Sequence, residues 1–242
     1  VGTAPITWFE RDGKVLVSMP GVPYEMQYAV EHEIIPRLQK QFETESYIRS
    51  IFIVGGYSES ALATHLTDFE NSLPEGFGLA YLPALGQIRL RLYVKGESRR
   101  DELNRETLRL EKLLEGHLMA REDISIGEIV GKKLLEKGLT LSTAESCTGG
   151  NIAHLLTVVP GSSRYFKGTI VSYANEVKIN MLSVSPQTLD EVGAVSEEVV
   201  IEMAKGALKQ LHTDCTIAVS GIAGPDGGTE DKTVGTVWIC TP

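Results

Sequence analysis

The sequence predicts an α/β protein whose carboxyl-terminal domain, residues 123–242, is layered α/β/α around a largely parallel or mixed sheet. The first observation is that strand and helix patterns alternate along residues 139–240, which is typical of a sheet with helices on both faces. The second is that residues 45–122 read as a small α+β domain. The third is that residues 1–44 supply only one strand and one helix, so we expect a remnant of a further α/β domain.

Composition indicates a globular protein without a broadly basic surface. Apolar residues make up 42% of the 242 residues, and the net charge is −9. We therefore expect no nucleic-acid partner, and any phosphate site must be local. No stretch approaches the roughly 20 apolar residues of a membrane span, and no signal peptide begins the chain, so no membrane partner is expected either.

The cysteines and histidines predict neither disulfides nor a metal site. The three cysteines, Cys147, Cys215 and Cys240, are odd in number and show no C-x-x-C spacing. The five histidines are scattered without the spacing of metal ligands. This number and spacing of cysteines and histidines favour a reducing, cytoplasmic location and a site without a metal.

Residues 1–44 are expected to be the end of a domain whose beginning lies outside this chain. Gly13 supports a turn, residues 15–17 a short strand, and a proline-rich loop precedes a helix that starts near Pro23. We expect these elements to pack on a neighbouring module. An intact functional site in this segment is the alternative.

Residues 45–122 predict a strand, a helix, a hairpin and a long amphipathic helix. The expected bounds are 48–54, 58–69 with Ser58 as N-cap, 79–82 paired with 87–95, and 100–118. In the hairpin, Gln87, Arg89 and Arg91 alternate with apolar residues, the pattern of a strand with one face in water. That basic face could bind RNA, but glutamates of the next helix dilute its charge, so a structural role is favoured.

The carboxyl-terminal domain opens with a capping box, in which Ser125 is the N-cap and Glu128 is the third helical residue. Gly138 closes that helix. The elements expected next are strand 139–144, helix 150–158, strand 168–173, helices 174–182, 186–192 and 196–211, and strands 215–220 and 234–240. Strands 139–144, 168–173 and 215–220 should converge at one edge of the sheet, where ligands usually bind.

Polar stretches follow these strands at 145–151, 172–178 and 220–228. Ser146 can act as a nucleophile only if a base takes its proton, and Lys178 is the nearby candidate, since a desolvated lysine can lose its charge. Tyr173 is expected to end a strand beside them. The alternative for Ser146 is simple N-capping of the helix that follows.

The backbone N–H groups of Thr148, Gly149 and Gly150 are expected at a helix start, where they suit an oxyanion or a phosphate. The same glycines also occur at ordinary tight turns. The sequence alone leaves both interpretations open.

Other reactive side chains are weaker candidates. Cys147 has no evident histidine partner, and a free cysteine is usually a small core residue. His154 lies among apolar residues, as packed or surface histidines do. Asp226, with Glu230 and Asp231, could hold a metal or a ribose hydroxyl, although acids in a glycine-rich loop commonly form turns.

Several motifs resemble one family. The runs TAESCTGG, GTIVSYANEVK, GAVSEEVV, SGIAGPDGG and VGTVW closely resemble the carboxyl-terminal domain of the competence/damage-inducible CinA family, also called nicotinamide-nucleotide amidase. The resemblance covers nearly all of residues 123–242. GTAP and MPGVPYEM resemble the end of the family's amino-terminal domain, which is similar to molybdopterin-binding proteins. The middle unit resembles the family's KH-like linker domain, in which GGYSES matches a G-x-x-ES pattern.

This resemblance implies an amidohydrolase that converts nicotinamide mononucleotide to nicotinic acid mononucleotide and ammonia, in pyridine-nucleotide salvage. Ser146 would be the nucleophile, with Tyr173 and Lys178 as its activating partners; the choice of Lys178 as base and Tyr173 as supporting donor comes from the residues themselves. The substrate would be bound by Thr148, Gly149, Gly150, Asn175, Ser220, Gly221 and Gly224. The amidase domain would need no cofactor, whereas a divalent metal is expected only for the family's amino-terminal pyrophosphatase domain.

Two other functions remain as alternatives. One is ADP-ribose or nucleotide pyrophosphatase activity of a longer protein, with this chain as an accessory part. The other is a non-catalytic nucleotide-binding regulator. The family continues past Pro242 with a further strand and helix, so we expect the amidase domain to be clipped there, and long apolar-faced helices make a homodimer plausible.

Overall fold

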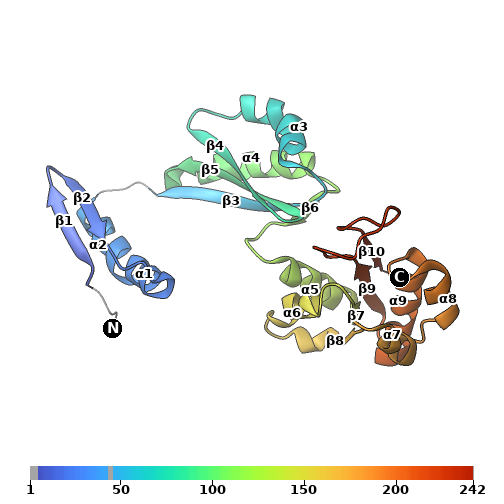
Figure 1. The fold of residues 1–242 in the computed structure, drawn as a ribbon. Coiled ribbons are helices and arrows are strands. Elements are labelled where there is room, and N and C mark those ends of the chain that lie inside the picture. The colour runs from blue at the N-terminus through green and yellow to red at the C-terminus, as the bar shows by residue number, and fades with distance from the viewer. Residues whose placement is uncertain (1–4, 43–45, 242) are drawn as a thin grey trace. The chain divides into compact units, whose positions relative to one another are not determined.

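The computed structural model describes residues 5–42 and 46–241, and the chain divides into two units, Val1–Arg121 and Glu122–Pro242 (Figure 1). The predicted boundary between residues 44 and 45 lies outside the described residues, as does most of the GTAP segment. The division into three domains therefore stays a prediction. Within the described ranges, no helix has both the length and the apolar composition of a membrane span.

The first elements are a hairpin and a helical segment. Strands β1 (Thr7–Arg11) and β2 (Lys14–Ser18) pair antiparallel, and Gly13 takes a φ of 71° in the tight turn between them. From the sequence, only the second of these strands is predicted. Helix α1 (Pro23–Ala29) continues through a π-helical turn, η1 (Val30–Ile34), into α2 (Ile35–Gln41), and it starts at Pro23 as expected.

The next elements form an antiparallel sheet in the order β4-β5-β3-β6. Their bounds are β3 (Tyr47–Val54), α3 (Glu59–Asn71), β4 (Phe77–Ala84), β5 (Gln87–Lys95), the short η2 (Glu97–Arg99), α4 (Arg100–Leu113) and β6 (Leu118–Ala120). One core joins the strands to the two helices through Phe52, Leu62, Leu66, Leu90, Leu92, Leu103 and Leu110. Ser58 caps α3 as predicted, since its side chain accepts a hydrogen bond from the Ala61 amide.

The prediction of one helix over residues 100–118 is wrong at its end. Helix α4 stops at Leu113, and Gly116 takes a φ of 83° that turns the chain back toward the sheet. Leu118 then pairs with Val54 in β6. The apolar periodicity continued into this strand, so the pattern alone could not mark where the helix ended.

The second unit is built on a sheet in the order β10-β9-β7-β8 (Figure 1). Strand β7 (Leu141–Glu145) is parallel to both β8 (Phe166–Val171) and β9 (Cys215–Gly221), whereas β10 (Val237–Cys240) is antiparallel to β9. The helices are α5 (Ile126–Lys137), α6 (Asn151–Thr157), η3 (Ser162–Arg164), α7 (Asn175–Leu182), α8 (Pro186–Val192) and α9 (Glu197–Leu211). The predicted mixed sheet in an α/β fold is confirmed.

Two apolar clusters lie on opposite faces of this sheet. Leu141 packs with Leu134 of α5 and Leu156 of α6. Ala144, which points to the other face of the same strand, packs with Val200 and Met203 of α9. The sheet therefore has helices on both faces, as the alternating pattern predicted.

Local signals place these helices. The capping box is present at Ser125 and Glu128, Gly138 ends α5 in the left-handed conformation, and Ser196 caps α9. At Gly206, an added Cβ would lie 1.9 Å from the Leu182 carbonyl oxygen. Glycine at this position thus lets α9 pack directly against the end of α7, the helix that carries Lys178.

Candidate active site

A cavity of about 330 Å³ lies where the parallel strands of the second unit end. Strands β7, β8 and β9 run in the same direction, so the segments that follow them meet at one edge of the sheet. Seven of the predicted site residues line the cavity, namely Ser146, Tyr173, Asn175, Lys178, Ser220, Gly221 and Gly224. The three polar stretches singled out in the sequence are therefore brought together, although not with every residue that was named.

Ser146 is the first residue after β7, and its side chain is nearly buried. Its amide donates to the Val219 carbonyl oxygen at 3.0 Å, which continues the pairing with β9 by one residue. The residue is 8% exposed. Helix α6 begins only at Asn151, and its N-cap is Gly150. The alternative in which Ser146 caps this helix is therefore wrong.

Lys178 is the fourth residue of α7, the helix that follows β8, and its side chain points toward Ser146. It is 1% exposed, and its Nζ lies 3.1 Å from Ser146 Oγ, within hydrogen-bond distance. The Ser172 and Tyr173 carbonyl oxygens accept hydrogen bonds from the same Nζ at 2.7 and 3.3 Å. The amine is thus held by two backbone carbonyls beside a single hydroxyl.

This set of partners satisfies an ammonium, which donates to all three oxygens, and equally a neutral amine, which donates two N–H groups and accepts with its lone pair. In the neutral form, the carbonyl oxygens take the two N–H groups because they can only accept, and the lone pair can face the Ser146 hydroxyl, which can donate. Burial lowers the pKa of the Lys178 ammonium below its ordinary value, and an ionised Cys147 nearby would partly oppose this shift. Position and desolvation both suit Lys178 to accept a proton.

Tyr173 reaches this site mainly through its backbone. Strand β8 ends at Val171, so the prediction that Tyr173 ends a strand is wrong. The Ser172 amide makes the last bond toward β7, to the Glu145 carbonyl oxygen at 2.8 Å, and the chain then leaves the sheet. Tyr173 is 77% exposed, and it lines the cavity while its carbonyl oxygen accepts from Lys178.

The contribution of the Tyr173 phenol can be measured directly in an assay of ammonia release. Tyr173→Phe should lower kcat by less than about tenfold, because the carbonyl that Lys178 contacts is kept. A loss of about 10³-fold would instead identify the phenol as a proton-transfer group, since such groups contribute roughly 10² to 10⁴ in rate.

Glu145 organises the turn between Ser146 and α6. Its side chain is fully buried and accepts hydrogen bonds from the Ile152 amide at 3.0 Å, the Ala153 amide at 2.8 Å and the Thr143 hydroxyl at 3.1 Å. A carboxylate of the protein therefore occupies the start of α6, where the sequence analysis expected an anionic part of a ligand. Apart from the position of Glu145 before the turn, nothing in the sequence indicates this role.

Thr148, Gly149 and Gly150 do not line the cavity. The Gly149 amide donates to the Ser146 carbonyl oxygen at 3.1 Å, and the Thr148 carbonyl oxygen accepts from the Asn151 amide at 3.0 Å. Gly149 and Gly150 have φ values of 59° and 96°, so these glycines form the tight turn. Their assignment to substrate binding stays a prediction without a contact to support it.

The opposite wall of the cavity comes from β9 and the loop that follows it. Ser220 is buried and donates to the Ala194 carbonyl oxygen at 2.7 Å, which fixes the residues before α9. An added Cβ at Gly221 would lie 2.9 Å from the Thr236 carbonyl oxygen and 3.1 Å from Cys147 Sγ. Gly224 similarly leaves room for Val234. Close packing accounts for both glycines.

Of the weaker candidates named from the sequence, Cys147 and Asp226 lie at the cavity and His154 does not. Cys147 lines the cavity as a free cysteine, and His154 is exposed on α6. Asp226 also lines the cavity, whereas no cluster of three or more possible metal ligands occurs in the part of the chain that the structure describes. Sequence reasoning missed Ala194 and Val195, which line the cavity and fall within the motif GAVSEEVV.

Comparisons with known proteins point to one family. The model of the CinA C-terminal domain matches residues 123–242. A CinA-like protein of Flavobacterium psychrophilum is 42% identical over 99% of this chain and 58% of its own length. A protein of Shewanella oneidensis named nicotinamide-nucleotide amidohydrolase PncC is 42% identical over 99% of this chain and 56% of its own length. The chain thus spans less than two thirds of these relatives.

Solved structures of the same family are also similar. The competence/damage-inducible protein CihA of Agrobacterium tumefaciens shares 43% identity, with 48% of this chain and 70% of that chain covered and a TM-score of 0.47. A CinA superfamily protein of Escherichia coli shares 37% identity, with 48% and 67% covered and a TM-score of 0.46. The chain belongs to the CinA family, with residues 123–242 as its CinA C-terminal domain.

Proposed function

We propose that this chain hydrolyses the carboxamide of nicotinamide mononucleotide to nicotinic acid mononucleotide and ammonia, with Ser146 as nucleophile and Lys178 as general base. The observation that carries the proposal is the 3.1 Å distance between Lys178 Nζ and Ser146 Oγ at a buried position beside the cavity. The name of the Shewanella oneidensis relative supports the substrate. Pyridine-nucleotide salvage and a cytoplasmic location complete the proposal.

The first half of the reaction forms an acyl-enzyme. Neutral Lys178 takes the proton from the Ser146 hydroxyl as Oγ bonds to the carboxamide carbon, and the electron pair of the C=O bond moves onto oxygen. The tetrahedral intermediate then collapses. The C–N bond breaks, Lys178 returns its proton to the leaving nitrogen, and ammonia departs, leaving the acyl group on Ser146 as an ester.

The second half of the reaction uses the same groups with water. Lys178 takes a proton from a water molecule that attacks the ester carbon, and it then returns the proton to Ser146 Oγ as the C–O bond to the enzyme breaks. The product is the free carboxylic acid, which loses its proton to solvent and becomes the carboxylate. Because one base serves both halves, every proton transfer within the site passes through Lys178.

The oxyanion of each intermediate needs donors that are already in place. In the described part of the chain, the Cys147 amide has no hydrogen-bond partner, and Cys147 lines the cavity directly after the nucleophile. We assign this N–H to the oxyanion. This donor lies one residue before the amides of residues 148–150, which the sequence left open as donors to an oxyanion or a phosphate or as parts of a tight turn.

The charge of the cavity suits the pyridinium ring of the substrate. Asp226 and Lys178 are both among the lining residues, and when the lysine is neutral the negative charge of the Asp226 carboxylate is in excess. A positively charged ring is then favoured over a neutral one. The glycine-rich loop at residues 220–228 supplies backbone groups for the phosphate.

The test is ammonia release from nicotinamide mononucleotide by the 242-residue chain, with nicotinic acid mononucleotide measured as the paired product. We expect turnover that a chelator such as EDTA leaves unchanged, because the proposed steps use no metal. Binding of the nucleotide without product above a heat-denatured control would favour a non-catalytic regulator. Loss of rate with EDTA and recovery with a divalent metal would reject the proposed chemistry.

A further inference from the structure

One face of the sheet in the first unit concentrates positive charge. Helices α3 and α4 pack against the face that carries Leu90, Leu92 and Val94 of β5. The alternate positions of β3 and β5 place every basic side chain of these strands on the opposite face, namely Arg49, Arg89, Arg91 and Lys95. No residue of β3, β4 or β5 is acidic. In a chain of net charge −9, the described residues of β3 and β5 thus place their basic side chains on one face, here called the basic sheet face.

Two of these cations lack the carboxylate partners that three arginines in or next to α4 have. Arg99, Arg100 and Arg109, in or next to α4, pair with Glu102, Glu97 and Glu106 at 2.5–2.6 Å. Among the described residues, neither Arg49 nor Arg91 has a carboxylate within ion-pair distance. Their charges are thus not neutralised by side chains of the described protein and remain to attract an anion.

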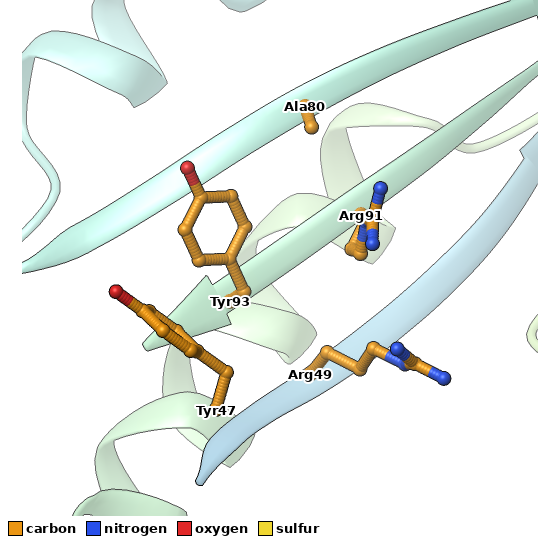
Figure 2. A pocket seen from close by; sticks show the side chains of 5 residues that line it. All are labelled: Tyr47, Arg49, Ala80, Arg91 and Tyr93. Atoms are coloured by element: carbon orange, nitrogen blue, oxygen red, sulfur yellow. The ribbon is translucent and has the colours of Figure 1, made fainter. Parts of the chain in front are cut away.

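Two tyrosine rings lie beside these arginines, as Figure 2 shows. Tyr47 and Arg49 come from β3, and Tyr93 and Arg91 come from the neighbouring β5, with Ala80 of β4 completing a cavity of about 440 Å³. The ring centroids of Tyr47 and Tyr93 are 5.8 Å apart, with an angle of 69° between the planes. Tyr47 is 60% exposed, so much of its ring surface is open to a ligand.

The position of Tyr93 depends on the neighbouring strand. Its ring lies over Gly78 of β4, where an added Cβ would be 2.5 Å from Tyr93 Cζ. The ring is therefore supported by backbone on one side and remains among the residues that line the cavity. A supported aromatic ring loses little conformational entropy when a second flat group stacks on it.

We propose that the basic sheet face binds single-stranded nucleic acid, with Tyr47 and Tyr93 stacking against bases and Arg49 and Arg91 contacting phosphates. Aromatic rings beside cations on an open sheet are the combination that holds unpaired strands without reading their sequence. A strand is favoured over one nucleotide because two rings and two cations lie side by side on neighbouring strands, Tyr47 and Arg49 on β3 and Arg91 and Tyr93 on β5. The expectation of no nucleic-acid partner came from net charge, which does not report the uneven distribution of acids.

The test is fluorescence anisotropy of the full chain with labelled oligo(U) and oligo(dT) of about 12 nucleotides, at several salt concentrations. Tyr47→Ala should weaken binding about tenfold, within the range for losing one base–aromatic stack. Tyr47→Phe keeps the ring and should bind within about twofold of the wild type. Arg49→Ala combined with Arg91→Ala should weaken binding and reduce the slope of log K against log salt by about 1.4, since each phosphate contact on a single strand contributes about 0.7.

The matched control is Arg105→Ala, which removes one exposed charge from α4, the helix behind the sheet. It should bind as the wild type does. Absence of binding by both oligonucleotides, or an unchanged affinity and salt slope in the double arginine variant, would overturn the proposal. Competition by uridine monophosphate as effective as by unlabelled oligo(U) would also overturn it, because the face would then be a mononucleotide site. Binding of oligo(U) alone or oligo(dT) alone would support it and identify the type of strand.

Discussion

Ser146→Ala should lower the rate of ammonia release from nicotinamide mononucleotide by about 10⁴ to 10⁶-fold. The substitution removes the only atom of this residue that can form the acyl-enzyme, and loss of a serine nucleophile has effects of this size in other hydrolases. The methyl group of alanine fits where the nearly buried Ser146 side chain lies, so the fold should be kept. The measurement is single-turnover and steady-state product formation, with thermal unfolding recorded in parallel.

Two further variants make this result specific. Ser163→Ala is the matched control, because Ser163 is an exposed serine outside the residues that line the cavity. It should retain full activity. Cys147→Ala should retain most of the rate, since the proposal uses its amide and not its thiol. An active Ser146→Ala protein together with an inactive Cys147→Ala protein would transfer the role of nucleophile to the thiol.

The parts of the fold that the sequence predicts best are those with local signals. The capping box at Ser125 and Glu128 and the cap at Ser196 are complete within three residues of chain, so the pattern determines where α5 and α9 begin. The end of α4 also carries a local signal, Gly116, but the apolar pattern continues through Leu118 and hides the change from helix to strand. The assignment of Leu118 to β6 depends on pairing with Val54, which is far away in the chain.

The candidate site shows the same difference between local and distant information. Strand order places Ser146 and Lys178 at one edge, and a lysine in a helix after the neighbouring strand is a reasonable base from sequence alone. The role of Glu145 is different. A buried carboxylate that accepts the Ile152 and Ala153 amides changes what the start of α6 can bind, and only the three-dimensional arrangement reveals it.

The basic sheet face also combines information that is local in the sequence with information that only the three-dimensional structure provides. Polar and apolar residues alternate in β5, which predicts a solvent-exposed face with Arg89 and Arg91. The net charge of −9 argues against a nucleic-acid partner. The register adds the decisive information, since Arg49 pairs with Tyr93 and Tyr47 pairs with Lys95 across two strands. Rings and cations from distant segments thereby share one surface, and this could not be read from either segment alone.

Lys178→Met should lower kcat by about 10³ to 10⁴-fold while KM changes little, because general-base catalysis contributes roughly this factor and the substrate does not depend on the amine for binding. Methionine has a similar length and suits a buried position, so the substitution should not unfold α7. The measurement is the steady-state rate of ammonia release over a range of substrate concentrations. Thermal unfolding of the same samples checks that the fold is retained.

Lys178→Arg distinguishes a base from a positive charge. Arginine keeps the charge but stays protonated in proteins, so this variant should be as inactive as Lys178→Met if the amine must accept a proton. Substantial activity in Lys178→Arg would reject Lys178 as the base and assign it an electrostatic role.

The pH dependence of the wild type follows from the same protonation state. Only neutral Lys178 can take the Ser146 proton, so kcat/KM should fall as pH decreases through the pKa of Lys178 in the folded protein. Because burial lowers the pKa of this ammonium, the fall should be centred below the ordinary lysine value. A pH profile of kcat/KM measures that midpoint. A profile whose only rise lies at the pKa of an exposed lysine would contradict the assignment, since Lys178 would then be charged at neutral pH and unable to start the reaction.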